Sequence, residues 1–200
     1  MSIIIEVGVN TGSDTFPLLM GSPDSKYYGF EPTPELYPHL QKQFGSNLNV
    51  LFIPMAVSNK NGSARFNVAG QGDWGCSSLN QFSDNIHEVW ENRSDFKFTH
   101  SYNVPTIRLD TFIENWNLKG EVIDFLWIDA QGHDMLVLES LGNNIRNVNK
   151  GRLEVAYTVE LYKGTNNTLQ NAETFLKNNG FHWKVTPDDV GKECNIEFWR

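Results

Sequence analysis

Short apolar runs alternate with amphipathic segments along most of the chain. Runs rich in β-branched and aromatic residues are typical of strands, and apolar positions three or four residues apart are typical of helices. The pattern predicts strands at residues 2–7, 26–31, 49–58, 104–112, 122–129, 152–161, 181–185 and 195–199, the fourth of which runs into Asp110. It predicts helices at residues 14–20, 34–44, 111–116, 134–142 and 167–179.

This alternation indicates an α/β fold with a doubly wound, mostly parallel sheet. The run at residues 122–129 is apolar almost throughout, which fits a strand that is buried on both faces. The last two strands are expected to form an antiparallel C-terminal hairpin. Gly142 is expected to end the helix before it, and the helix at 34–44 could begin at Pro34 or at Pro38. Residues 1–200 are expected to form one domain.

Residues 59–103 interrupt the alternation. They begin with an expected hairpin at 59–68 and continue through a glycine- and serine-rich stretch into an aromatic one. A long excursion in a compact domain is usually functional or mobile. Trp74, Trp90 and Phe96 favour a folded lid over a disordered surface loop.

Composition narrows the function classes. The chain has 16 basic and 24 acidic residues, a formal charge of -8, which argues against nucleic-acid partners and anionic membranes. No apolar stretch reaches the ~18 residues of a membrane span, and no signal peptide is evident, so a cytoplasmic protein is expected. Cys76 and Cys194 lack the close spacing of a thiolate metal site and are expected to be reduced.

The end of the first strand carries an unusual group of residues. Glu6 lies inside the apolar run, and Gly8, Asn10 and Gly12 follow it. Doubly wound sheets bind ligands at the carboxyl ends of their strands. Gly8 would allow a close backbone approach to a ligand, whereas Ser13 stands where a dinucleotide fingerprint needs its third glycine. The lysine of a phosphate-binding loop is also absent.

The charge at this corner indicates a cationic ligand. Glu6 would repel phosphates and suits an ammonium group, and Glu31, at the end of the second strand, is placed to accept hydrogen bonds from both ribose hydroxyls of a nucleoside. Together the two carboxylates indicate a nucleoside that has a cationic tail and no phosphate, and S-adenosylmethionine is such a molecule. The alternative is that Glu6 is solvated and that Glu31 caps the turn before Pro32.

Six segments in a fixed order then resemble the FkbM-type S-adenosylmethionine-dependent methyltransferases. They are EVGVNTG (6–12), FEPTPELYPHL (30–40), AVSNKNGSARF (56–66), CSSL (76–79), IRLDTF (107–112) and DFLWIDAQGHDMLVLESL (124–141). The resemblance implies a seven-stranded Rossmann-like methyltransferase sheet. It also implies an enzyme that usually methylates hydroxyl oxygens, often of sugars or polyketide-like compounds.

The resemblance also assigns residues. It implies that Glu6, Gly8, Asn10 and Gly12 form the cofactor loop, that Glu31 holds the ribose, that Ala56, Val57 and Ser58 lie near the adenine, and that Asp129, Gly132 and His133 match the family's D-x-x-G-H-E segment. Four positions depart from the family pattern. Trp127 stands where a lysine is more common, Val9 where an alanine is more common, Glu6 replaces an aspartate, and Asp134 replaces a glutamate. Members also commonly carry structure before the first strand.

Methyl transfer to an alcohol calls for removal of a proton, and therefore for a base or a metal. Asp129 and His133 are the candidate catalytic residues, one as general base and the other orienting it. Glu160 is a candidate substrate-binding residue at the end of the next strand, and a metal bound by Asp129, Asp134 and Glu160 is the less favoured alternative.

The lid adds further candidates. Trp74 could stack on a sugar or an adenine ring, while Gly75, Ser77 and Ser78 could contact the cofactor. The sequence therefore favours an S-adenosylmethionine-dependent O-methyltransferase that acts on a small-molecule hydroxyl acceptor, such as a saccharide. The alternative is a catalytically idle domain that binds a nucleoside or a partner protein. A nicotinamide-dependent oxidoreductase is disfavoured by the missing fingerprint, and an oligomer stays open.

Overall fold

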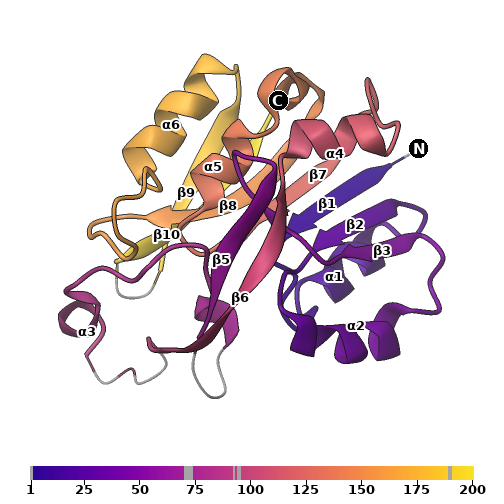
Figure 1. The fold of residues 1–200 in the computed structure, drawn as a ribbon. Coiled ribbons are helices and arrows are strands. Elements are labelled where there is room, and N and C mark those ends of the chain that lie inside the picture. The colour runs from indigo at the N-terminus through magenta and orange to yellow at the C-terminus, as the bar shows by residue number, and fades with distance from the viewer. Residues whose placement is uncertain (1, 70–73, 92, 94–95, 189–190) are drawn as a thin grey trace.

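The computed structural model describes residues 2–69, 74–91, 93, 96–188 and 191–200 (Figure 1). Its strands are β1 (Ile3–Val7), β2 (Lys26–Phe30), β3 (Val50–Ile53), β4 (Ala56–Val57), β5 (Gly62–Ala69), β6 (Phe98–Ile107), β7 (Phe125–Ile128), β8 (Lys150–Ala156), β9 (His182–Pro187) and β10 (Glu193–Trp199). Its α-helices are α1 (Thr15–Gly21), α2 (Tyr37–Phe44), α3 (Ile86–Val89), α4 (Leu109–Asn115), α5 (Asp134–Glu139) and α6 (Leu169–Asn178). Short 3-10 helices cover Pro34–Leu36, Trp74–Cys76 and Gly142–Asn147.

The central sheet has seven strands in the order β3-β2-β1-β7-β8-β10-β9. The first five pair in parallel, whereas β10 pairs antiparallel with both β8 and β9. The expected doubly wound sheet and its antiparallel C-terminal hairpin are therefore confirmed. Within the hairpin, β9 forms the edge of the sheet and β10 lies inside it.

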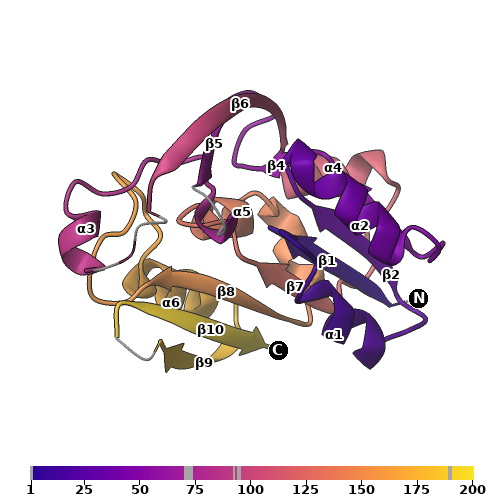
Figure 2. The same cartoon turned by 90° about the horizontal axis from the view of Figure 1, so that it is seen from below.

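Helices lie on both faces of this sheet. Figures 1 and 2 show α1 and α2 beside β1–β3 on one face, and α4, α5 and α6 on the opposite face. All five residues of β1 are buried, as expected for a central parallel strand. The crossovers place the carboxyl ends of β1, β2 and β7 at one edge, where the connecting loops meet.

A second sheet was not expected from the sequence. Its three strands run in the order β4-β6-β5, with β5 and β6 forming a long antiparallel pair. The expected strand at 49–58 is split at Pro54 and Met55 into β3, which pairs with β2, and β4, which pairs with β6. Proline lacks an N–H and disrupts a strand ladder, so the chain changes sheets there. The hairpin expected within 59–68 was also wrong, because β5 is one strand that pairs with residues 98–106.

Several element boundaries also differ from the sequence predictions, and the strand expected at 104–112 is wrong in its second half, because β6 ends at Ile107 and a helix follows. Strand β8 ends at Ala156 and not at residue 161, and α5 ends at Glu139, before the 3-10 helix that begins at Gly142. Helix α4 begins at Leu109, with Arg108 in the N-cap position, so Asp110 does not cap it. Asp110 instead accepts a hydrogen bond from the Thr111 backbone N–H within the first turn.

The segment between β5 and β6 is folded where the structure describes it. Cys76, Ile86 and Phe96 form a buried cluster with Leu161 and Tyr162, and Trp90 packs against this cluster. Residues 70–73, 92 and 94–95 of the expected lid lie outside the described residues. The described part packs against the loop that follows β8, and a role as a lid stays a prediction.

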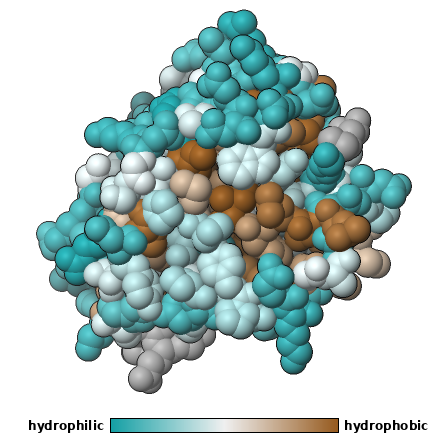
Figure 3. Space-filling view, turned by 45° about the vertical axis from the view of Figure 1, so that its right-hand side comes forward, coloured by the Kyte–Doolittle hydropathy of each residue, from teal (hydrophilic) through white to brown (hydrophobic). Residues whose placement is uncertain are grey.

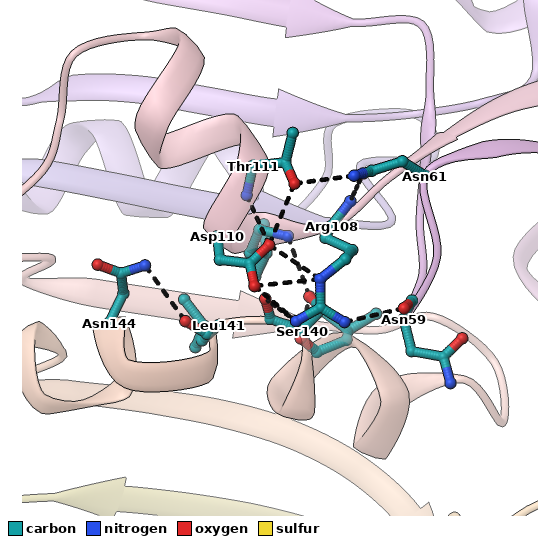
Figure 4. A network of polar contacts seen from close by, with 10 residues as sticks. Asn59, Asn61, Arg108, Asp110, Thr111, Ser140, Leu141 and Asn144 are labelled. Carbon is teal, nitrogen blue, oxygen red and sulfur yellow. Dashed lines mark hydrogen bonds and ion pairs between the residues drawn. The ribbon is translucent and has the colours of Figure 1, made fainter.

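Arg108, which follows β6, lies at the centre of a polar network at the start of α4 (Figure 4). Its guanidinium donates to both carboxylate oxygens of Asp110 and to the Asn59 carbonyl at 2.8 Å. The fully buried Ser140 hydroxyl accepts from the Leu109 N–H at 3.1 Å and donates to the Val137 carbonyl. The turn after β4, the start of α4 and the end of α5 are thereby held together.

Some apolar surface remains exposed. Figure 3 turns the right-hand side of Figure 1 toward the viewer and shows apolar side chains gathered on this face. Large exposed apolar residues of the chain include Phe16, Met20, Leu48 and Leu51, the last of which lies on the edge strand β3. Among the described residues, no helix is both long and apolar enough to cross a bilayer.

Candidate functional site

A pocket of about 600 Å³, including its open mouth, lies at the carboxyl ends of β1, β2 and β7. The second sheet and the lid form its other walls. The lining comprises Val7, Gly8, Asn10, Phe30, Glu31, Pro32, Thr33, Leu36, Met55, Ala56, Val57, Phe66, Trp74, Gly75, Ser77, Leu79, Asp129, Ala130, Gln131 and His133. The pocket therefore brings together residues from five of the six segments that the sequence singled out.

The loop after β1 is shaped by its neighbours on both sides. The N–H groups of Gly8 and Val9 donate to the Phe30 carbonyl of β2. Gly8 has φ +88°, and a Cβ there would come within 1.8 Å of the Asp129 carbonyl oxygen. Only glycine fits this position. Gly12 does not line the pocket, because it lies in a separate hollow beside Phe44.

Glu31 lies on the pocket wall and is 4% exposed. Its Oε2 accepts from the Asn10 N–H at 2.8 Å, and its Oε1 accepts from the Thr33 N–H at 2.8 Å. Burial raises the pKa of Glu31, and the hydrogen bonds from Thr33 and Asn10 oppose that shift. Each oxygen keeps a lone pair for a further donor. The carboxylate therefore shapes the loop after β1 and can still bind a ligand.

Glu6 is not part of the pocket lining and is 1% exposed. Its Oε2 accepts hydrogen bonds from the hydroxyls of Thr15 and Tyr27, while its Oε1 is buried without a partner among the described residues. Burial raises the pKa of Glu6 to about 8. The interpretation of Glu6 as a solvated side chain is therefore wrong, and the alternative role as a charge partner for a cation stays a prediction.

The segment after β3 and the lid form the opposite wall. Ala56 and Val57 line the pocket from β4, whereas the Ser58 hydroxyl lies behind the wall and bonds His133. Trp74 of the lid lines the pocket and packs with Val9 and the other apolar residues of the cluster around α2. A single aromatic ring therefore joins the lid to the loop after β1.

Asp129 follows β7 directly and lines the pocket. Its Oδ1 accepts from the Gln131 side-chain amide at 2.8 Å. Burial raises the pKa of Asp129, whereas the Gln131 hydrogen bond and the Arg152 charge lower it. Trp127 pairs with Arg152 in the β7–β8 register, and the guanidinium lies 4.4 Å from the indole centroid. Arg152 thus supplies a positive charge beside the position where the family more often has lysine.

His133 precedes α5 and lines the same pocket, but its contacts differ from the prediction. Its Nε2 lies 3.0 Å from the Ser58 hydroxyl and its Nδ1 lies 3.3 Å from the Asn80 side-chain oxygen. An amide oxygen only accepts hydrogen bonds, so Nδ1 carries the imidazole proton, and Nε2 accepts a hydrogen bond from the Ser58 hydroxyl. Burial lowers the pKa of His133 to about 4. The imidazole is neutral near pH 7, and both of its nitrogens are used by groups other than Asp129.

Ser78 and Glu160 lie elsewhere than predicted. Ser78 is 1% exposed and its hydroxyl donates at 2.6 Å to the Gln131 carbonyl, so it supports the turn after β7 from behind the pocket wall. Glu160 is exposed, because β8 ends four residues earlier, and its Oε1 accepts from the Gly164 N–H. The pocket lining does not include Glu160, so the geometry gives its predicted substrate contact no support.

The sequence analysis missed three polar residues that organise the site. Asn80 bonds His133, Gln131 bonds Asp129, and the Tyr162 hydroxyl donates to the Gln131 side-chain oxygen at 2.7 Å. Asn80 and Tyr162 lie far from the turn in sequence, so no local pattern could identify them. Among the described residues, no cluster of three or more His, Cys, Asp or Glu side chains has the arrangement of a metal site.

Comparison with known proteins identifies the family. A family model described as the Methyltransferase FkbM domain matches residues 6–182, and the chain therefore belongs to the FkbM methyltransferase family. The 2-O-methyltransferase NoeI of Sinorhizobium fredii (strain NBRC 101917 / NGR234) is 30% identical over 142 residues, which cover 68% of this chain and 56% of NoeI. The chain thus spans little more than half the length of this relative.

Solved structures agree with the fold. The crystal structure of methyltransferase FkbM from Methylobacillus flagellatus KT superposes with a TM-score of 0.58 at 9% identity, over 98% of this chain and 44% of that one. The precorrin-6y C5,15-methyltransferase of Geobacter metallireducens GS-15 gives a TM-score of 0.50 at 12% identity, over 99% of this chain and 80% of that one. At such low identities, the likeness concerns the Rossmann-like fold alone.

Proposed function

We propose that this chain is an S-adenosylmethionine-dependent methyltransferase that methylates a hydroxyl oxygen of a small molecule, with a saccharide as the favoured acceptor class. The observation that carries the proposal is the convergence of the loop after β1, Glu31 and Asp129 on one pocket. Membership of the FkbM family supports methyl transfer, and the name of NoeI, a 2-O-methyltransferase, supports an oxygen acceptor.

The residues at the end of β1 fit this cofactor. Glu6 Oε1 and Asn10 Oδ1 are buried acceptors without a partner among the described residues. An ammonium group has three N–H donors and would satisfy such acceptors. Gly8 has no side chain, so a ligand can approach the backbone beside these two acceptors. The Glu31 carboxylate has lone pairs left to accept hydrogen bonds from ribose hydroxyls. Ala56 and Val57 offer an apolar wall for a purine ring.

The chain's own residues then position the acceptor and remove its proton. S-adenosylmethionine would supply an electrophilic methyl group on a cationic sulfur and would leave as a neutral thioether. Asp129 would accept the proton from the acceptor hydroxyl, because its carboxylate lines the pocket and is hydrogen-bonded on one oxygen by Gln131. His133 would hold the turn and the lid in place through Ser58 and Asn80. Trp74 and Leu79 would exclude water from the lid side.

Calorimetric titration with S-adenosylhomocysteine, with NAD as the negative control, tests the cofactor. We expect micromolar binding of S-adenosylhomocysteine and no heat from NAD. Transfer from methyl-labelled S-adenosylmethionine to a panel of saccharides and other polyols then tests the acceptor class. Binding of S-adenosylhomocysteine without any methyl transfer would favour the idle binding domain. No binding of either S-adenosylhomocysteine or NAD would contradict the proposed cofactor.

A further inference from the structure

Gln131 uses its whole side-chain amide within the protein. Its Nε2 lies 2.8 Å from Asp129 Oδ1 and 3.4 Å from Glu154 Oε2, so its two N–H groups face two carboxylates. Its Oε1 accepts from the Tyr162 hydroxyl at 2.7 Å. An ionised Asp129 only accepts hydrogen bonds, so the amide nitrogen faces it and the amide oxygen is left to accept from the Tyr162 hydroxyl.

The backbone also fixes Gln131. Its φ is +49°, and Gly132 follows with φ +84°. A Cβ at Gly132 would come within 2.4 Å of the Tyr162 ring, so the ring packs directly on this turn. Tyr162 is 4% exposed and contacts Phe82, with ring centroids 5.4 Å apart. The turn, the lid and the loop after β8 therefore hold the amide in one orientation.

Asp129 lies among many groups of like charge. The Asp14 charge raises its pKa and the Arg152 charge lowers it, while the Asp129 charge in turn raises the pKa values of Glu6, Glu31, Asp134, Glu154, Tyr162 and Glu193. Neutral His133 lines the pocket beside them. Burial and the Asp14 charge disfavour a charged Asp129, and Arg152 is the cation that opposes them. An N–H aimed at Asp129 Oδ1 favours the carboxylate.

We propose that Gln131 is a positioning residue that holds the Asp129 carboxylate oriented and ionised for proton removal, and that Tyr162 fixes Gln131 in turn. The inference rests on the proposed function, in which Asp129 takes the proton from the acceptor oxygen as the new carbon–oxygen bond forms. Gln131 itself gives up no proton. It orients one oxygen of Asp129 and leaves the other for the acceptor.

Carbon-13 NMR of protein labelled at the aspartate carboxyl carbons tests this inference directly. The Asp129 signal is assigned by its loss in Asp129→Asn, and its titration midpoint is measured with and without S-adenosylhomocysteine. Gln131→Met removes the amide donor at similar volume and should raise the Asp129 midpoint by about one pH unit. Tyr162→Phe removes a single hydroxyl and should shift the midpoint in the same direction by less.

Tyr157→Phe is the matched control, because Tyr157 is 41% exposed and is not part of the pocket lining. It should leave the midpoint unchanged. Unchanged midpoints in both Gln131→Met and Tyr162→Phe would overturn the inference. If Gln131→Met does not fold, the midpoint of Tyr162→Phe alone tests the inference. Failure of wild-type protein to bind S-adenosylhomocysteine would instead count against the proposed function, so the two failures are distinguishable.

Discussion

The carboxylates around the pocket differ in what their oxygens contact. Glu31 is held by two backbone N–H groups, Asp129 by one side-chain amide, and Glu6 by two hydroxyls with one oxygen left over. Backbone donors fix a carboxylate together with the loop that carries them, whereas a side-chain donor can be removed with the backbone left in place. Each carboxylate therefore calls for a different substitution.

Glu31→Ala should weaken S-adenosylhomocysteine binding by about 1.5 to 3 kcal/mol, roughly ten- to a hundredfold or somewhat more. The variant loses the ribose acceptor and also leaves the Asn10 and Thr33 N–H groups without their partner. Calorimetry measures the change, and circular dichroism confirms the fold. Glu35→Gln, outside the pocket lining, is the control and should bind as the wild type does. Equal affinities of Glu31→Ala and the wild type would remove Glu31 from the site.

The raised pKa of the Glu6 carboxyl group should make cofactor binding depend on pH. Its pKa is raised to about 8 by burial, so below pH 8 a bound ammonium group must displace a proton from the carboxyl. The affinity for S-adenosylhomocysteine should therefore rise between pH 6 and pH 8, by at most about tenfold per pH unit. Glu6→Gln cannot titrate and should flatten this rise. Parallel affinity–pH curves for the variant and the wild type would contradict the assignment.

At the scale of the elements, the short loops at the sheet edge are held by buried side chains from neighbouring helices. Ser140 at the end of α5 is the partner of Leu109 N–H at the start of α4. Ser140→Ala should lower the free energy of unfolding by about 1 to 3 kcal/mol, because it leaves a buried N–H unsatisfied. Urea denaturation measures the loss, with the exposed Ser63→Ala as control. A Ser140→Ala midpoint equal to that of the wild type would show that the network is dispensable.

The elements of the main sheet were predictable because each has a strong local pattern. The apolar run before Asp129 and the β-branched run before Gly8 both gave the correct strands and the correct edge. The second sheet could not be predicted in the same way. Strands β5 and β6 pair across some 30 residues, and the local spacing of apolar residues does not indicate which distant strands pair. The same limit applies to the site. Gly8 and Glu31 are evident from sequence, whereas Gln131 depends on Tyr162, which only the folded chain brings near.

At the scale of the whole molecule, buried acids set how stability changes with pH. Burial raises the pKa of Glu6 to about 8, of Asp134 to about 8, of Glu154 to about 9 and of Glu193 to about 7. The folded state therefore binds more protons than the unfolded state from about pH 4.5 up to these values. The free energy of unfolding must fall as the pH rises through this window. His133, whose pKa is lowered to about 4, acts in the opposite direction, but only below about pH 6.5.

The thermal midpoint should accordingly decrease from pH 6.5 to pH 9. Glu154→Gln removes one of the raised carboxyls and should make the decrease shallower, while the exposed Glu197→Gln on β10 should leave it unchanged. Differential scanning calorimetry across this range measures both slopes. A midpoint that stays constant over the same range would show that the buried acids are already ionised in the folded protein.

The contact between Gly8 and the Asp129 carbonyl also has a consequence for protein synthesis. Strand β1 is synthesised before the other strands of its sheet, yet it lies between β2 and β7, and β7 begins only at residue 125. A nascent chain that ends near residue 120 contains the whole glycine loop but lacks the strand that forms its second wall. The ligand site therefore forms late, and a messenger truncated before that point encodes a chain that carries the motif without the pocket.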